Sequence, residues 1–260
     1  MGFAVINDHR IHYEDTGGEG LPVVFSHGFL MDRAMFDPQV EALADKYRCI
    51  TWDERGFGQT ECKGPFSYWD SASDLIGLLD HLGIDRAVLV GMSQGGYLSL
   101  RATLADPDRV RALVLIDSQA AADTPEEREG FQAMHDAWIE YGPIDAVAGG
   151  IADLILGPGV DHHEWLVRWR FRPPSMLTEP FNTLVGRDDI TARLGEIKCP
   201  VLIFHGGEDQ AIPMERAEQV RDGVADCAGI VVVEGAAHAP NLSHPEAVNG
   251  PLSEFLAGIN

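Results

Sequence analysis

The stretch Val90-Gly91-Met92-Ser93-Gln94-Gly95-Gly96 decides the fold, because it joins two elements of opposite kind. Before it, residues 87–90 form a continuous apolar run, as expected for a strand buried on both faces. After it, residues 94–105 have the pattern of a helix. The flanking glycines permit a turn that is too tight for bulkier residues. The sequence therefore predicts a sharp turn that holds Ser93 at the carboxyl end of a buried strand, where open α/β sheets bind ligands.

Strand-like and helix-like stretches alternate on both sides of this turn. The predicted strands cover 5–6, 11–13, 22–26, 48–52, 87–90, 110–116, 201–204 and 230–233. The predicted helices of the same region cover 34–46, 69–82, 94–105, 214–224 and 245–257. Such alternation with short connections implies parallel strands joined by right-handed crossovers. The fold class predicted is α/β, with a mostly parallel, doubly wound sheet.

The alternation is interrupted once, between residues 119 and 195. This segment has helical pieces separated by Gly157-Pro158-Gly159 and Pro173-Pro174, and it lacks a strand-like run of comparable strength. The helical pieces are 126–141, 144–156 and 162–170. We therefore predict a core domain made of residues 1–118 and 196–260, with a helical cap inserted at 119–195.

Composition narrows the class of protein. The 260 residues are 45% hydrophobic and 23% charged, which is typical of a globular chain. A net charge of −22 argues against binding to nucleic acid or to an anionic membrane surface. No apolar run is long enough to span a membrane, no signal peptide is visible, and the four cysteines show no CxxC spacing. These features favour a cytoplasmic protein with reduced thiols, and they leave open whether it is a monomer or a homo-oligomer.

A serine hydroxyl becomes a good nucleophile only when a base takes its proton and an acid orients that base. His238 lies in a loop of small residues directly after the last predicted strand, so it is the base we expect. His244 is better explained as a capping or surface group. Asp209 and Asp117 both follow buried strands, and position alone does not separate them. We favour Asp209 as the acid and Asp117 as a cap or hydrogen-bond partner, and we expect activity to fall in acid as His238 is protonated.

The same chemistry needs two N–H donors for the oxyanion of the reaction intermediate. One expected donor is the backbone N–H of Gln94, directly after Ser93. The other is the N–H of Phe29, in the loop after the strand 22–26, where Gly28 lets the backbone turn. His27 is interpreted as a buried imidazole that hydrogen-bonds neighbouring loops rather than as a base.

Taken together, these segments resemble the α/β-hydrolase fold superfamily over nearly the whole chain. The matching residues are His27-Gly28-Phe29, Asp53-Glu54-Arg55-Gly56-Phe57-Gly58-Gln59-Thr60, the turn at Ser93, the Gly-x-x-Asp loop ending at Asp209, and His238. The resemblance implies that Asp53 and Arg55 brace loops around the site without being catalytic. It also implies that residues 119–195 cover the pocket.

Within that superfamily, the residue at the position of Ser93 indicates the type of reaction. Haloalkane dehalogenases and epoxide hydrolases carry Asp at this position, whereas a serine points to acyl transfer. The tail from His238 to Glu246 resembles that of enol-lactonase-like and small esterase members. Hydrolases of C–C bonds often have Trp where this chain has Ala239, and perhydrolases usually have Pro where it has Leu30 and Met31. These two differences argue against C–C bond hydrolysis and against perhydrolysis.

The expected function is hydrolysis of small to medium, partly apolar carboxylic esters or lactones, through an acyl-enzyme on Ser93. Two alternatives are kept open. One is a C–C bond hydrolase that uses the same triad of Ser93, Asp209 and His238, and the other is a receptor for a lactone-type ligand. No cofactor is expected. Large cap side chains are candidates for lining the substrate pocket, namely Met134, Trp138, Trp165 and Trp169.

No metal site is expected either. The adjacent histidines in Asp161-His162-His163 are interpreted as surface groups, because neighbouring residues on a helix point in different directions. Three arginines, Arg168, Arg170 and Arg172, are expected to solvate one face of the cap, although one that turned inward could bind a substrate carboxylate.

Overall fold

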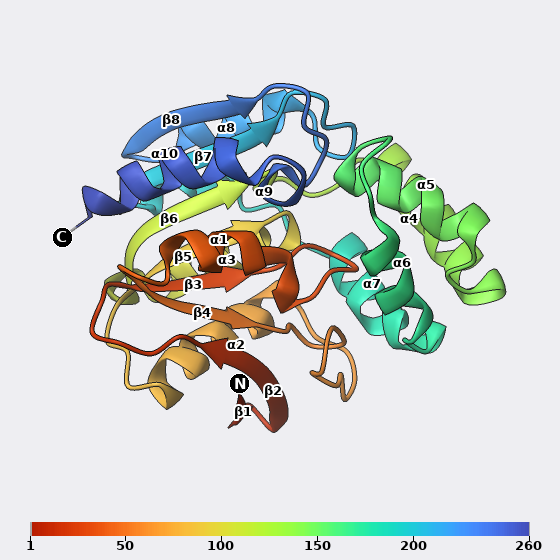
Figure 1. The fold of residues 1–260 in the computed structure, drawn as a ribbon, viewed down its shortest axis with the longest axis horizontal. Helices are drawn as coiled ribbons and strands as arrows, with labels where there is room; N and C mark the ends of the chain where they lie inside the picture. The colour runs from red at the N-terminus through yellow and green to blue at the C-terminus, as the bar shows by residue number, and fades with distance from the viewer. Residues whose placement is uncertain (1, 260) are drawn as a thin grey trace.

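The computed structural model describes residues 2–259, which form one eight-stranded sheet with helices on both faces (Figure 1). The strand order is β1-β2-β4-β3-β5-β6-β7-β8. The strands are β1 (Gly2–Ile6), β2 (His9–Asp15), β3 (Pro22–Ser26), β4 (Arg48–Trp52), β5 (Ala87–Met92), β6 (Val110–Ile116), β7 (Val201–Gly206) and β8 (Cys227–Val233). β1 and β2 pair antiparallel and join the sheet antiparallel to β4, and the remaining pairs are parallel. The predicted α/β fold with a mostly parallel, doubly wound sheet is confirmed.

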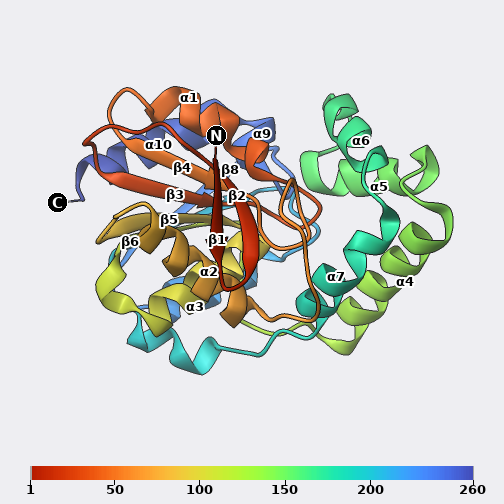
Figure 2. The ribbon, with the colours of Figure 1, turned by 90° about the horizontal axis from the view of Figure 1, so that it is seen from below.

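Helices cover the two faces of the sheet in separate layers (Figure 2). One face carries α1 (Asp37–Leu43) and α10 (Pro245–Ala257), and the other carries α2 (Tyr68–His81), α3 (Gln94–Ala105) and α8 (Met214–Gly223). β5 shows why both layers are needed. Ala87 and Leu89 belong to the apolar cluster on the α2–α3 side, and Val88 and Val90 belong to the cluster on the α1 side. Such a strand is apolar on both faces and is stable only when both are covered.

A further group of four helices lies beside the carboxyl ends of the parallel strands in both ribbon views (Figures 1 and 2). These are α4 (Pro125–Tyr141), α5 (Asp145–Leu156), α6 (His163–Arg170) and α7 (Thr178–Val185). A capping box formed by Thr124 and Glu127 starts α4. Ile190, Leu194 and Ile197, farther along the chain, belong to the apolar cluster under the sheet. We refer to α4–α7 as the cap, while the domain boundaries at 118 and 195 stay a prediction.

Short elements complete the chain. They are α9 (Pro240–Ser243) and the 3-10 helices Arg33–Phe36, Pro107–Arg109, Pro174–Leu177 and Thr191–Glu196. Two contacts tie the cap to the loops of the sheet. The indole N–H of Trp169 donates to the Leu30 carbonyl at 2.7 Å, and the Ala239 N–H donates to the Ile155 carbonyl at 2.7 Å. Within residues 2–259, no helix is both long enough and apolar enough to cross a membrane.

Candidate active site

Ser93 occupies a strained turn between β5 and α3. Its φ is +49° and its ψ is −116°, a conformation that residues with a side chain rarely adopt. The turn leaves no room beside it: a Cβ on Gly91 would lie 2.3 Å from the Gly95 carbonyl oxygen, and one on Gly95 would lie 1.9 Å from the Ser26 carbonyl oxygen. The Ser93 N–H donates to the Ile116 carbonyl at 2.9 Å. The glycines of the motif are therefore required by the close approach of backbone segments.

Two loops at the same edge of the sheet bring His238 and Asp209 together. His238 follows β8 and Asp209 follows β7, and His238 Nδ1 lies 2.8 Å from Asp209 Oδ2. Asp209 Oδ1 accepts the N–H groups of Ala211 and Ile212 at 2.8 and 3.2 Å. Burial acts to raise the pKa of Asp209, but the charge and hydrogen bond of His238 outweigh it, so the pKa falls to about 2. The carboxyl group is therefore ionised and aimed at the imidazole.

Asp117, the second candidate for the acid, lies beside this pair but has different partners. It follows β6 with a φ of +44°, and its Oδ1 accepts the Gly206 N–H at 2.8 Å. Its side chain is fully buried. Burial, followed by the neighbouring Asp209 carboxylate, raises the pKa of Asp117 well above its usual value. The structure thus distinguishes the two acids, because His238 Nδ1 donates its described hydrogen bond to Asp209.

The loop after β3 lies against Ser93. A Cβ on Gly28 would lie 3.7 Å from the Ser93 Cβ, and Phe29 is the next residue. The Phe29 ring packs edge-on against Phe57, with centroids 5.7 Å apart. Gln94 is the first residue of α3, directly after Ser93. The segments that carry the expected N–H donors of Phe29 and Gln94 therefore both adjoin the serine.

His27 holds two loops together, as expected from the sequence. Its Nε2 accepts the Glu54 N–H at 3.0 Å, so its Nδ1–H donates to the Gly28 carbonyl at 2.8 Å. Burial lowers the pKa of His27, which keeps the ring neutral. Both ring nitrogens are occupied, and neither is available as a base.

Asp53 and Arg55 have the bracing contacts that the resemblance implied. Asp53 accepts the backbone N–H groups of Arg33 and Gln59, each at 2.8 Å. Arg55 forms a buried ion pair with Asp74, with Nε 2.5 Å from Oδ2. These contacts fix the loop after β4 next to the loop that carries Phe29.

Sequence reasoning missed Tyr97, which lies on α3 one turn after Ser93. Tyr97 is buried, and its backbone N–H donates to the Ser93 carbonyl at 3.2 Å. The signal was available, because residues four apart share a helix face. Behind Tyr97, Arg187 lies with its guanidinium carbon 4.5 Å from the ring centroid. Arg187 also forms an ion pair with Asp123 in which both side chains are 2% exposed.

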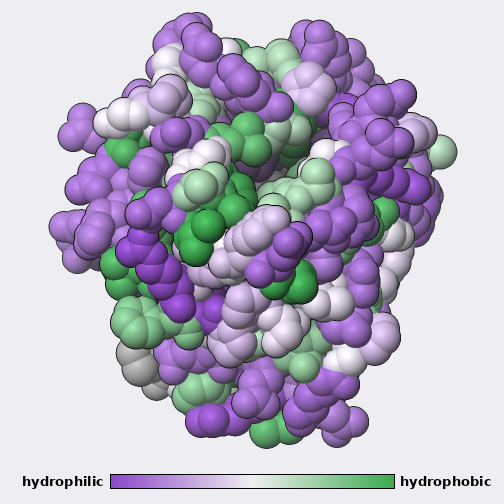
Figure 3. Space-filling model, turned by 90° about the vertical axis from the view of Figure 1, so that its right-hand side faces the viewer, coloured by the Kyte–Doolittle hydropathy of each residue, from purple (hydrophilic) through white to green (hydrophobic). Residues whose placement is uncertain are grey.

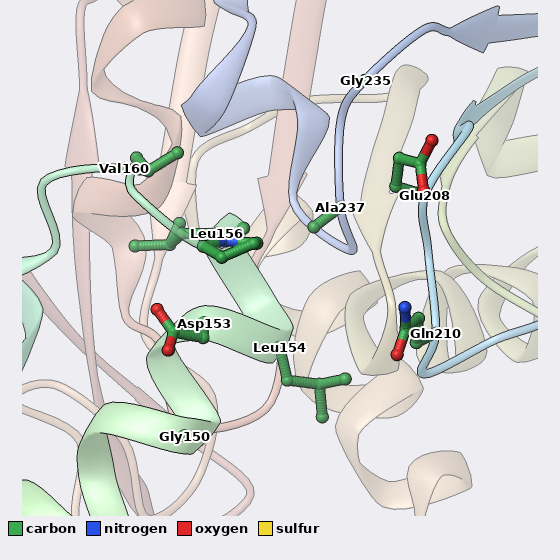
Figure 4. Close-up of a pocket in the computed structure, with 11 residues that line it drawn as sticks. Gly150, Asp153, Leu154, Leu156, Val160, Glu208, Gln210, Gly235 and Ala237 are labelled. Carbon is green, nitrogen blue, oxygen red and sulfur yellow. The ribbon is translucent and has the colours of Figure 1, made fainter.

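Two large cavities adjoin the cap, and hydrophobic residues surround a hollow on this face of the molecule (Figure 3). The first, here called the loop cavity, measures about 530 Å³ and lies between α5 and the loops of Asp209 and His238. Figure 4 shows Leu154 and Leu156 of α5 across from Gln210 and Ala237. The second, here called the cap cavity, measures about 550 Å³ and lies between α4 and α5. Its wall is mostly apolar and includes Phe131, Met134, Val147, Ile151 and Leu154.

The four side chains expected to line a pocket are distributed unequally. Met134 lines the cap cavity. Trp138 and Trp169 line a space of about 20 Å³ and pack edge-on against each other, with centroids 5.8 Å apart. Trp165 is 7% exposed and belongs to the apolar cluster. The three tryptophans therefore pack the cap against the sheet domain, because large apolar rings are most stable when fully buried.

Two of the three arginines expected on the cap surface form ion pairs there, and the third turns inward. Arg168 pairs with Glu164 and Asp32, at 2.7 and 3.0 Å. Arg170 pairs with Asp145. Arg172 turns inward, where it donates to the Gly56 carbonyl and lies 5.3 Å from the centroid of Phe57.

One group of described side chains has the spacing needed to hold a metal ion: Asp117, His205 and Asp209, with donor atoms all within 4.8 Å of one another. Asp209 already accepts three hydrogen bonds there, from His238 and two backbone N–H groups. An ion would have to compete with those bonds. At Asp161-His162-His163, His162 Nε2 instead lies 3.1 Å from Asp153 Oδ1 at the surface.

Comparison with known proteins gives a consistent result. The model of the alpha/beta hydrolase family matches residues 23–250. A protein of Agrobacterium fabrum, provisionally named carbamate hydrolase RutD, is 29% identical over 95% of this chain and 98% of its own. The 3-oxoadipate enol-lactonase 1 of Acinetobacter baylyi is 26% identical over 94% of this chain and 92% of its own. A thermophilic esterase of Thermogutta terrifontis superposes with a TM-score of 0.88 at 30% identity, covering 98% of this chain and 97% of that one.

Proposed function

The chain belongs to the alpha/beta hydrolase family, and from that premise we propose that it is a serine hydrolase of carboxylic esters or lactones. The observation that carries the proposal is the hydrogen bond of 2.8 Å between His238 and Asp209, formed at the sheet edge where the strained turn presents Ser93. A serine, an imidazole and a buried carboxylate in this chain order are the parts that acyl transfer needs.

In the proposed reaction, His238 takes the proton of the Ser93 hydroxyl while its oxygen attacks the substrate carbonyl. Asp209 accepts the His238 Nδ1–H, which fixes the tautomer and stabilises the imidazolium that forms. The backbone N–H groups of Phe29 and Gln94 donate to the oxyanion of the tetrahedral intermediate. The intermediate collapses, and His238 protonates the leaving alcohol. Water activated by His238 then releases the acid from Ser93.

The cavities beside the cap support a substrate of small to medium size with an apolar part. Their volumes of about 530 and 550 Å³ are in the range of small-molecule sites. Relatives named esterase and enol-lactonase act on bonds of the same chemical class, and a relative named carbamate hydrolase extends that class to a carbonyl bearing nitrogen. All three reactions begin with attack on an acyl carbon.

The test is a comparison of initial rates for the wild type and Ser93→Ala on one panel. The panel contains p-nitrophenyl acetate, butyrate and octanoate, several lactones followed by pH-stat, a phenyl carbamate and a vinylogous 1,5-diketone. We expect turnover of esters or lactones that falls at least about 10³-fold in the variant. Equal rates in both proteins would exclude Ser93 as the nucleophile. Turnover of the diketone alone would favour C–C bond hydrolysis by the same triad.

A further inference from the structure

A second buried carboxyl group, that of Asp117, lies close to Asp209, the proposed acid of the triad. Asp117, His205 and Asp209 have their donor atoms within 4.8 Å of one another, although they come from the ends of two strands and the loop that follows. Asp117 and His205 are 0% and 1% exposed. Two carboxylates in contact, away from water, cannot both be ionised, so this cluster must hold a proton.

The hydrogen bonds decide where that proton lies. Asp209 accepts two backbone N–H groups and lies against His238, and all three favour its charged form. Asp117 accepts one backbone N–H on Oδ1, from Gly206, and its Oδ2 is buried with no hydrogen bond to another described group unless it is itself protonated. A proton on Asp117 Oδ2 would give this atom a hydrogen-bond partner, because the hydroxyl then donates to the Asp209 carboxylate.

His205 does not take the proton in its place. Its ring hydrogen-bonds the backbone of Ile212, while Nδ1 is buried and lies 3.7 Å from Asp117 Oδ1. Burial lowers the pKa of His205, so the ring stays neutral. A neutral imidazole with its lone pair facing Asp117 supplies no positive charge that would let both carboxyl groups ionise.

We propose that Asp117 is a neutral carboxylic acid whose Oδ2 hydroxyl donates a hydrogen bond to Asp209 and thereby positions the carboxylate that orients His238. The proposal rests on the function given above and adds a positioning residue to it. Asp117 touches neither substrate nor Ser93 in this role. Its effect is to hold the Asp209 carboxylate in the direction that orients His238.

Two substitutions of Asp117 test whether it must donate a hydrogen bond to Asp209 or only fill the space beside it. Asp117→Asn keeps a neutral group of the same shape with an N–H donor for Asp209, and Asp117→Leu fills the site without a donor. We expect Asp117→Asn to react with a fluorophosphonate at Ser93 within about threefold of the wild-type rate. We expect Asp117→Leu to react about 10- to 100-fold more slowly, with the cost in kcat rather than KM on any substrate found.

Thermal unfolding gives a second readout that does not depend on the triad. Keeping Asp117 protonated in the folded state, when it ionises freely in the unfolded chain, makes the wild type lose stability as the pH rises above the usual pKa of a carboxyl group. Asp117→Asn has no such loss. The melting temperature of Asp117→Asn relative to that of the wild type should therefore increase between about pH 4 and pH 8. This measurement also decides the case in which Asp117→Leu does not fold.

Several results would overturn the proposal. Loss of about 100-fold or more in Asp117→Asn would mean that the ionised form of Asp117 is required. An unchanged labelling rate in Asp117→Leu would remove the positioning role, and a melting-temperature difference that does not vary with pH would remove the buried proton. Stoichiometric zinc in the purified protein would assign the cluster to a metal. Failure of the proposed function looks different, because the wild type would then not be labelled at Ser93 while the pH trend of Asp117→Asn persisted.

Discussion

The carboxyl edge of the sheet and the cap are held by different kinds of contact. At the sheet edge, Asp53 and Asp117 are buried and accept backbone N–H groups from loops that are distant in sequence. The buried Asp209 side chain accepts N–H groups of its own loop. In the cap, the ion pairs of Arg168 and Arg170 lie at the surface, and buried tryptophans supply the packing. Two cavities of about 530 and 550 Å³ adjoin the cap helices.

This difference separates the chemistry of the protein from its choice of substrate. Buried hydrogen bonds have fixed directions, so the sheet edge holds its side chains within narrow limits. Apolar packing is less directional and tolerates exchange of similar side chains. We therefore expect substitutions at the sheet edge to change rates by large factors and substitutions in the cap to change preference among substrates.

The largest effect is expected for Asp209→Asn. The new amide presents a donor to His238 Nδ1 and favours the wrong tautomer, so kcat should fall about 10⁴-fold while KM changes little. Steady-state kinetics on the best ester of the panel measures this. Asp226→Asn makes the same chemical change at an exposed residue just before β8, so it is the matched control and should keep the wild-type rate. More than a tenth of the wild-type kcat in Asp209→Asn would place the acid elsewhere.

The next effect concerns the two ends of the cap. Asp123 precedes α4 and Arg187 follows α7, and their buried ion pair joins the segments where the cap begins and ends. Arg187→Met leaves Asp123 charged and unpaired, so the free energy of unfolding should fall by about 3–5 kcal/mol in urea titrations. The double variant Arg187→Met with Asp123→Leu should recover most of this loss. If the single variant is as stable as the wild type, the pair does not clamp the cap.

A smaller effect is expected from pH at the sheet edge. The pKa of Asp209 falls from 3.8 to about 2 on folding, so its contribution is complete above about pH 4 and is lost as the pH falls toward 2. The loss should be about 2 kcal/mol in the free energy of unfolding. It is measured as the difference between the wild type and Asp209→Asn, because the variant lacks the titrating group. A constant difference between pH 4 and pH 2 would contradict the depressed pKa.

The smallest effect is expected in the cap. Met134→Trp adds volume inside the cap cavity, so it should reduce the rate on p-nitrophenyl octanoate about tenfold relative to the acetate. Ala133→Trp makes the same ring at the adjacent exposed position and should leave that ratio unchanged. Equal loss on both esters in Met134→Trp would mean that the cap cavity does not bind the acyl chain.

The core elements could be predicted from the sequence because each has a strong periodic signal. The bounds of α3, β6 and α10 agree with the predicted 94–105, 110–116 and 245–257. β8 begins three residues before the predicted 230, because Cys227, Ala228 and Gly229 lack a strand pattern. Helix α7 was missed, since only the short 3-10 helix Pro174–Leu177 separates it from Pro173, and it contains Pro180.

Candidate site residues stand out in the sequence where a loop directly follows a strand, whereas candidates whose role depends on tertiary contacts do not. Ser93 and His238 stand out by position, but Asp117 and Asp209 look alike in the sequence. Only the three-dimensional arrangement distinguishes them, because Asp209 lies against the His238 imidazole, whereas Asp117 Oδ2 is buried without a hydrogen-bond partner among the described residues. The cap tryptophans had no such signal, because apolar spacing does not tell a packed ring from a pocket wall.

The most direct test of the account is active-site labelling followed by intact-mass and peptide analysis. Purified wild type is incubated with a fluorophosphonate, and the modified residue is located by tandem mass spectrometry. The account predicts one adduct per chain, on Ser93, whose formation is abolished in Ser93→Ala and slowed in His238→Ala. An adduct on another residue, or equal labelling of Ser93→Ala, would contradict the claim that the turn after β5 carries the nucleophile.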